Sequence, residues 1–272
     1  MFPFLEILPA FWHKGRVHVG SITIFPIKSL DGVTVDEARI TPGGILENDR
    51  IYSIVDASGK VVNGKRTPRV HQLRCAFGAG IREVRVWENG GASPTHFSLT
   101  EPTALAAWLS EFFGFPVTLQ HEAQKGFPDD LTAFGPTITS EASLHEVQKW
   151  FPELTLEGLR RRFRTNLELA GAEPFGEDQL FGAPDELKPF QVGTVNFLGH
   201  NPCQRCVVPT RDPDAGQPVD GFQKKFMIMR QKFLPSWSNS QRFNHYYRFA
   251  VNTSITPAEG GKRLRTGDVV KF

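Results

Sequence analysis

Cysteine is scarce in this sequence, and the scarcity limits the metal and disulfide chemistry that the chain can support. Three cysteines occur in 272 residues, too few for the disulfide framework of a small secreted protein. They are also too few for a four-thiolate zinc or iron–sulfur site built from one copy of the chain. We therefore expect free thiols in a reducing compartment, and we predict a cytoplasmic location.

Net charge and long apolar runs are scarce as well. The sequence has 31 Lys and Arg against 29 Asp and Glu, a balance that argues against a general nucleic-acid or membrane-surface binder. The apolar segment 1–12 is too short to span a bilayer core of about 30 Å and lacks the features of a signal peptide. We expect it to pack along the domain surface, with a peripheral membrane contact as the alternative, and we predict no nucleic-acid or membrane partner.

Short β-branched and aromatic runs, separated by Gly and Pro, make up much of the chain. The early runs are 19–25, 33–40, 51–55 and 70–77. Later runs are 167–169, 192–198, 206–208, 246–251 and 269–272. Close spacing of the early runs without intervening helices predicts an antiparallel barrel or curved sheet.

Helical spacing occurs only in the middle of the chain. It predicts one helix from an N-cap at Thr100 to a stop at Gly114, a second beginning near Ser140, and a third over 156–163. Turn residues cluster near 126–130, so we predict two domains, 16–125 and 126–272. The expected fold is mainly β with a few covering helices, an α+β chain of two β-barrel-like units.

Cys203 and Cys206 are the most informative residues for chemistry. Thiolates are soft metal ligands, and Arg205 between them offers a fork for an anion. A thioredoxin-like pair should begin a helix, whereas Val207, Val208 and Pro209 follow here. If the pair is considered alone, the two cysteines could also be small apolar side chains buried in the core.

Zinc binding is a further interpretation of the same cysteines, in two forms. A zinc deaminase would need an upstream His-x-Glu, and the chain has only the adjacent pairs His121-Glu122 and His145-Glu146. A structural zinc held by both cysteines would require two further ligands, for which His200 and His245 are the candidates.

Cations and hydrogen-bond donors recur at the ends of predicted elements. They are Lys28-Ser29, Asp49-Arg50, Arg66 to Arg69 and Arg164-Thr165-Asn166. Singly, such groups are usually solvated or capping residues. Together they could converge on one anionic ligand.

Taken in order along the chain, these segments resemble the MOSC family, named for the molybdenum cofactor sulfurase C-terminal domain, with the β-barrel domain that often precedes it. The resemblance spans residues 20–272. It is carried by "FPIKSLDGVTVDEARIT", "LENDRIYSIVD", "SEASL", "RFRTNLELAGAEPFGED", "CQRCVVPTRDPDAG" and "LRTGDVVKF".

The resemblance implies a role for individual residues. It implies that Cys206 is the catalytic residue and the protein ligand to molybdenum, with Cys203 as a neighbour. The residues implied to bind the pterin cofactor are Lys28, Ser29, Arg50, Arg164, Asn166, Gln204 and Arg205, with Arg69 as a further contact.

Several positions depart from the family pattern. Thr165 replaces a usual proline, Gln179 and Leu180 replace an aromatic, and Ala215-Gly216 replaces Thr-Gly. The segment 222–247 has no counterpart that we could align. These departures affect the expected substrate pocket more than the expected metal ligand.

The implied function is that of a molybdenum-cofactor (Mo-molybdopterin) oxidoreductase that reduces small N-hydroxylated or N-oxide substrates by oxygen-atom abstraction at a cysteine-ligated molybdenum. The sequence has no flavin, haem or iron–sulfur motif of its own, so we expect an external electron donor, ferredoxin-like or cytochrome b5-like, with its reductase. The alternatives are a carrier of the cofactor or of a persulfide on Cys206, and a family fold that has lost its cofactor.

Overall fold

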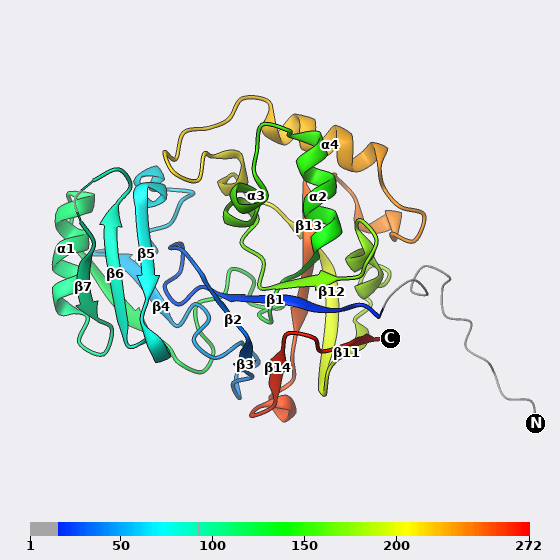
Figure 1. Ribbon diagram of the computed structural model, residues 1–272, viewed down its shortest axis with the longest axis horizontal. Helices are drawn as coiled ribbons and strands as arrows, with labels where there is room; N and C mark the ends of the chain where they lie inside the picture. The colour runs from blue at the N-terminus through cyan, green and yellow to red at the C-terminus, as the bar shows by residue number, and fades with distance from the viewer. Residues whose placement is uncertain (1–15, 92) are drawn as a thin grey trace, which may run out of the picture.

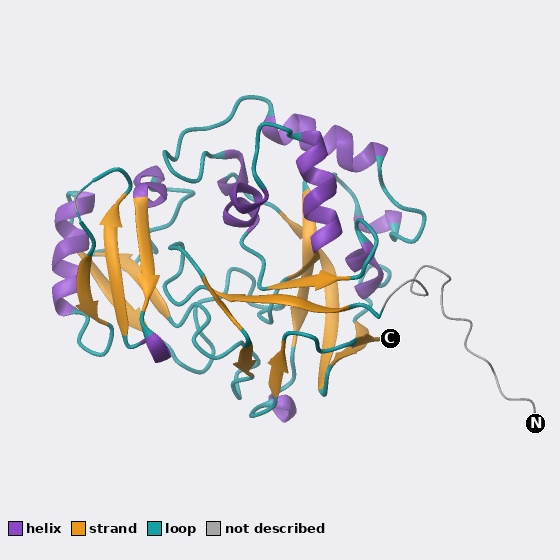
Figure 2. Cartoon of the chain, in the orientation of Figure 1, coloured by secondary structure: helices purple, strands orange, loops and turns teal. Residues whose placement is uncertain are grey.

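The computed structural model describes residues 16–91 and 93–272. The expected packing of segment 1–12 therefore lies outside the described residues. Within these ranges the chain is mainly β with a few covering helices, as the sequence predicts (Figure 2). No helix in the described ranges is long and apolar enough to cross a membrane.

The larger β unit is a sheet that closes on itself. Its strand order is β15-β11-β12-β13-β9-β10-β1-β2. The strands are β1 (His18–Ile24), β2 (Val33–Val35), β9 (Ile138–Ser140), β10 (Leu167–Ala170), β11 (Lys188–Val192), β12 (Val195–Gln204), β13 (Arg248–Ser254) and β15 (Val270–Lys271). Val19 N donates to Asp268 O at 2.9 Å and Val270 N donates to Val17 O at 2.9 Å, which joins β1 to the end of the chain. Closure removes the exposed sheet edge between these strands.

Strand β1 shows how closely the two halves of the sequence are interleaved. It pairs with β10 and belongs to the closed sheet, although it precedes residue 126. Buried Val19 and Ile22 pack with Leu167 and Val195 in the core of that sheet. The boundary between 16–125 and 126–272 stays a prediction.

A smaller β unit, found in Figure 1 by the labels β4 to β7 and α1, lies beside the larger one. Its elements are β4 (Tyr52–Asp56), β5 (Leu73–Phe77), β6 (Glu83–Glu88), β7 (Thr95–Ser98), α1 (Thr103–Phe113) and β8 (Val117–His121). Two further short strands, β3 (Glu37–Arg39) and β14 (Arg263–Arg265), pair with each other. Leu105 and Leu109 of α1 are fully buried against the sheet residues Ile54 and Val86.

Three helices cover the larger unit, as Figure 1 shows: α2 (Glu141–Trp150), α3 (Leu156–Phe163) and α4 (Phe222–Lys232). The predicted starts of the first two are confirmed, because Ser140 Oγ accepts from Ser143 N and Thr155 Oγ1 accepts from Gly158 N. Helix α4 lies in the segment that the family pattern did not cover. It buries Phe222 and Phe226 in an aromatic cluster with α2 and α3.

Four local predictions were wrong. Helix α1 begins after Pro102 rather than at Thr100, whose hydroxyl bonds Ser98 instead. Run 33–40 forms two strands instead of one, and the start of run 70–77 is the end of a 3-10 turn. The predicted strand 206–208 is absent: β12 ends at Gln204, and a 3-10 turn containing Pro209 follows at Val208–Thr210, because proline cannot donate to a sheet.

A buried carboxyl group in the larger unit gives a first testable prediction. Thr139 Oγ1 and Ser143 Oγ donate to Glu177, which is fully buried. Burial, with the neighbouring charge of Asp178, raises the pKa of Glu177 from 4.5 to about 7. The folded state therefore holds this proton more tightly than the unfolded chain, and stability falls as the pH rises from about 4.5 to about 7.

Glu177→Gln is expected to flatten this decline. We compare the free energy of unfolding of the variant with that of wild type. This difference should be up to about 3 kcal/mol more favourable to the variant at pH 8 than at pH 4, because the neutral amide carries no cost of ionisation. Urea unfolding of both proteins at the two pH values measures the difference. An identical pH dependence in the two proteins would show that Glu177 does not titrate in this range.

Candidate functional site

One cavity, about 830 Å³ in volume, lies where the two β units meet. This is large enough for a cofactor or drug-sized ligand. Eight of the nine residues expected at the site line it: Lys28, Ser29, Arg50, Arg164, Asn166, Gln204, Arg205 and Cys206. Cys203 lines it as well.

Arg69 is the expected site residue that the structure does not bring into this cavity. Its guanidinium stacks on the Phe112 ring at 4.3 Å and faces Glu88 at 3.9 Å. Both contacts lie on the smaller unit, and Arg69 is not among the residues that line the cavity.

The guanidinium of Arg164 forms no ion pair within the described residues, although the charges of Asp31 and Asp129 act on it from nearby. It ends helix α3 in a left-handed conformation, with φ of 53°, and its guanidinium lies over the Phe25 ring at 4.2 Å. Its backbone N donates to Arg160 O at 2.8 Å, whereas its guanidinium has no hydrogen bond within the described residues. Burial lowers its pKa to about 10, and the nearby charge of Arg50 adds to the effect. An unpaired, largely desolvated guanidinium facing a cavity is suited to bind an anion.

Left-handed backbone is shared by three cavity residues that are not glycine: Ser29, Arg50 and Arg164, with φ of 75°, 51° and 53°. Such conformations cost about 1–3 kcal/mol each and persist only where surrounding contacts enforce them. Here Arg50 N donates to Phe25 O at 2.8 Å and Lys28 N donates to Tyr52 O at 2.8 Å. These bonds fix the two loops that carry Ser29 and Arg50 against the cavity.

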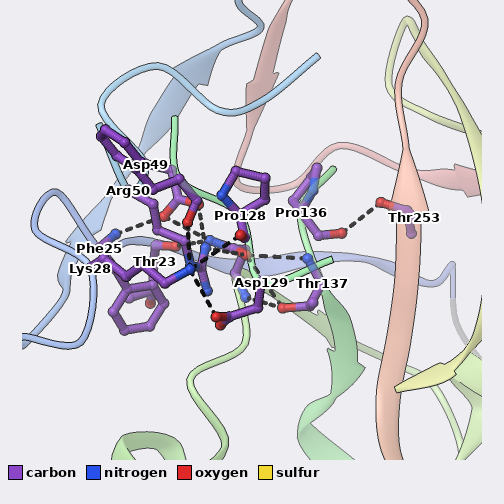
Figure 3. Close-up of polar contacts among 12 residues, drawn as sticks. Thr23, Phe25, Lys28, Asp49, Arg50, Pro128, Asp129, Pro136, Thr137 and Thr253 are labelled. Atoms are coloured by element: carbon purple, nitrogen blue, oxygen red, sulfur yellow. Dashed lines mark hydrogen bonds and ion pairs between the residues drawn. The ribbon is translucent and has the colours of Figure 1, made fainter. Parts of the chain in front are cut away.

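Asn166 bonds residues in or next to both of these loops, and its partners Thr23, Asp49, Arg50 and Thr137 are labelled in Figure 3. Its side chain is buried; its Nδ2 donates to Thr23 O at 3.0 Å and to Asp49 Oδ1 at 3.1 Å. Its Oδ1 accepts from Arg50 Nη1 at 3.2 Å and from Thr137 N at 3.2 Å. Because protein groups use its donors and acceptors, Asn166 positions Arg50 and Asp49.

Lys28 fastens the loop between β8 and β9 over the cavity (Figure 3). Its ammonium donates to Phe127 O at 2.9 Å and Pro128 O at 3.1 Å, and it pairs with Asp129 at 2.9 Å. These three contacts match the three protons of the group. Ten residues between 125 and 137 line the cavity, and no motif in this loop predicts that role.

The two cysteines have different surroundings. Arg205 Nη1 donates to Cys203 Sγ at 3.3 Å, and its Nη2 donates to Phe163 O, one residue before Arg164. Cys206 follows the last sheet bond, Arg205 N to Tyr247 O, and lies partly exposed in the cavity wall. Its sulfur has no hydrogen-bond partner within residues 16–91 and 93–272. It is therefore the thiol that is free to bind a soft metal.

Strand β13 has a bulge opposite Cys203. Pro202 pairs with Val251 and Gln204 pairs with Arg248, which leaves one extra residue on β13. Ala250 absorbs it with φ of 69°. Bulges commonly redirect side chains next to functional sites.

The structural zinc interpretation was wrong. Among the described residues no group of three or more His, Cys, Asp or Glu could hold a metal ion. His200 Nε2 bonds Ser254 Oγ at 2.7 Å, and His245 Nδ1 accepts from Tyr247 N at 3.2 Å. A metal at Cys206 would therefore take most of its ligands from a small-molecule cofactor.

The turn after Cys206 joins the two β units. Asp212 Oδ1 accepts from Ala215 N at 2.8 Å, and Asp214 pairs with Arg161 at 2.9 Å and with Arg74 of the smaller unit at 3.4 Å. A Cβ at Gly216, whose φ is 71°, would lie 2.5 Å from Pro68 O. Glycine is needed at this contact, and both aspartates hold the turn in place.

These features define a class: a protein of two β units whose shared cavity combines an unpaired cation, suited to an anion, with one free thiol, suited to a soft metal. Comparison of sequences agrees. Residues 16–155 match the MOSC N-terminal beta barrel domain, and residues 135–271 match the MOSC domain. The chain belongs to the MOSC domain family.

Similar proteins of known function include two human proteins. The chain is 24% identical to mitochondrial amidoxime reducing component 2 of Homo sapiens, over 84% of this chain and 78% of that protein. It is 26% identical to mitochondrial amidoxime-reducing component 1 of Homo sapiens, over 73% of this chain and 67% of that protein. It is also 22% identical to molybdenum cofactor sulfurase of Oryza sativa subsp. japonica, over 74% of this chain but only 29% of that protein.

Proposed function

We propose that this protein binds the molybdenum cofactor through Cys206 and reduces small N-hydroxylated or N-oxide compounds. The observation that carries the proposal is the free Cys206 thiol in the same cavity as the unpaired Arg164 guanidinium. The similarity to amidoxime-reducing components supports this choice of reaction.

The residues of the cavity fit a phosphorylated pterin that carries its own sulfur ligands. Its phosphate needs several converging donors, which Arg164, Arg50 and Ser29 would supply. Its two dithiolene sulfurs leave one protein thiolate to be provided, by Cys206. Gln204 and Arg205, which precede Cys206, would lie along the cofactor.

When bound, the cofactor would supply the two-electron chemistry that removes oxygen from the N–O bond. The chain's own contribution is to hold and shield the site. Cys206 would fix the metal in the cavity wall, and Arg205 keeps the Cys203 sulfur engaged at 3.3 Å. Lys28 holds the 125–137 loop in place, which limits the access of water.

Electrons would come from a separate protein, ferredoxin-like or cytochrome b5-like, together with its reductase. The described residues offer no cluster of ligands for a second metal centre of the chain's own. A cytoplasmic location, expected from the free thiols, belongs to the same proposal.

The test is reduction of benzamidoxime by protein purified from a molybdenum-competent host, with reduced methyl viologen as donor. We expect about one molybdenum per chain and formation of benzamidine. Protein from tungstate-grown cells is the control and should form none. Bound molybdenum without reduction of benzamidoxime or of an aromatic N-oxide would contradict the proposed reaction.

The similarity to molybdenum cofactor sulfurase, which covers 74% of this chain, favours a second candidate function. In that case the protein would carry the cofactor, or a persulfide on Cys206, to another protein. Transfer of molybdenum to an apo-enzyme, without any reduction of benzamidoxime, would favour the carrier.

A further inference from the structure

The cavity holds more positive charge than the proposed cofactor contacts use. Ten Lys or Arg and four Asp line it, whereas the whole chain carries a net charge of only +2. Several of the ten have carboxylate partners: Lys28 with Asp129, Arg50 with Asp49, Arg161 with Asp214 and Arg162 with Asp212. Arg242 and Arg248 line the cavity and have no ion-pair partner within the described ranges.

Arg242 and Arg248 lie along β12, before the cysteines. Arg248 Nη1 donates to Pro202 O at 2.9 Å, and Arg242 Nη2 donates to His200 O. Arg164 is at the end of α3, and Arg205 bonds the α3 residue Phe163 on one side and Cys203 on the other. Arg164 thus follows helix α3, whereas Arg242 and Arg248 are bonded to carbonyls of β12 that precede the 203–206 segment.

The side chains around this pair are mainly polar and uncharged, with one acid, Asp130, nearby. Asn201, Asn244 and Asn252 line the same part of the cavity, and Asn244 Oδ1 accepts from Arg248 Nη2 at 2.7 Å. Asp130 is the nearby acid, and its oxygens accept from Thr132 N, Ala133 N and Asn252 Nδ2. Arg248 Nε is buried with no hydrogen-bond partner. The pair is held by neutral oxygens, which orient the guanidinium groups without neutralising them.

We infer that Arg242 and Arg248 form an anion subsite that selects substrates carrying a carboxylate in addition to the N–O group. Each guanidinium carries five N–H protons, more than its bonds to protein oxygens use, and a carboxylate could accept from those that remain. A substrate held there would lie beside Cys203 with its other end toward Cys206. The inference rests on the proposed function, because it assigns the substrate of that site.

Matched substrates test this subsite. Benzamidoxime is neutral, and its 3- and 4-carboxylates add one negative charge. We expect the better carboxylate to exceed benzamidoxime in kcat/KM by about 10- to 100-fold, the usual effect of a hydrogen bond between charged groups. Equal values for all three compounds would overturn the subsite while leaving the proposed reaction in place.

Asn244→Asp neutralises the pair without removing either arginine. The new carboxylate would accept the same bond from Arg248 that the amide now accepts. The preference for the carboxylate substrate should then fall by about tenfold or more. The matched control is Arg85→Met, which removes an exposed cation on β6 and should leave the preference unchanged. An unchanged preference in Asn244→Asp would contradict the inference.

Binding gives a measurement that does not depend on turnover. Calorimetry should show the holoprotein binding 4-carboxybenzamidine more tightly than benzamidine, and Asn244→Asp should lose this difference. This binding result tests the subsite independently of turnover. If it is obtained and none of the amidoximes is reduced, the subsite stands and only the proposed reaction fails. Molybdenum content should be equal in wild type and Asn244→Asp. A loss of molybdenum in that variant would assign the arginine pair to the cofactor and overturn the inference.

Discussion

Cys206→Ala is expected to reduce benzamidoxime no faster than the artificial donor does alone. The substitution removes the one cavity thiol without a hydrogen-bond partner in the described part of the chain, and with it the proposed protein ligand of the metal. The assay is turnover per bound molybdenum, so that loss of cofactor and loss of chemistry are counted separately.

Cys203→Ala is the matched control, since it removes a thiol from the same cavity wall. Cys203 contacts Arg205 and is proposed as a neighbour of the metal ligand. We therefore expect the turnover rate of the Cys203→Ala variant to stay within about tenfold of wild type. Full activity per molybdenum in Cys206→Ala would contradict the assignment of Cys206. Equal losses in both variants would show that the two sulfurs act together.

Arg164→Gly is expected to separate cofactor binding from protein stability. The variant loses the unpaired cation of the proposed phosphate site, so cofactor retention should weaken by about 10- to 100-fold. The free energy of unfolding of the cofactor-free protein should stay within about 1 kcal/mol of wild type. Relief of the left-handed backbone, about 1–3 kcal/mol, offsets the lost stacking on Phe25, about 0.5–2 kcal/mol.

Molybdenum content after dialysis measures retention, and urea unfolding measures stability. Arg85→Met, which removes an exposed cation that does not line the cavity, should match wild type in both. If Arg164→Gly retains its molybdenum, the phosphate site lies elsewhere. A large loss of stability would instead give Arg164 a structural role.

The sequence predicted the fold class and most strands and helices because these depend on local pattern. Apolar spacing and capping residues located α2 and α3, and Gly114 ends α1 with φ of 77° as expected. The errors fall where a local pattern was outweighed by a longer-range contact. Residues 206–208 have β-branched character, but the chain turns there toward Pro209 and the smaller unit.

Most of the predicted residues line one cavity, but the contacts that each of them makes could not be predicted from the sequence. The sequence motifs identified eight lining residues. Sequence spacing cannot reveal that the side-chain amide of Asn166 is hydrogen-bonded to Thr23, Asp49 and Arg50, because these partners lie more than a hundred residues away along the chain. Arg242 was missed because it belongs to the segment 222–247, which carries no recognisable motif, and Arg69 was included because a basic pair on a turn does not say which way it faces.

The most direct test of the account is X-ray absorption at the molybdenum edge. The central claim is that Cys206 alone of the cavity thiols binds the metal, in a site whose cations hold the rest of the cofactor. The account predicts that the sulfur coordination number falls by one in Cys206→Ala and is unchanged in Cys203→Ala. An unchanged sulfur shell in Cys206→Ala, with molybdenum still bound, would contradict it.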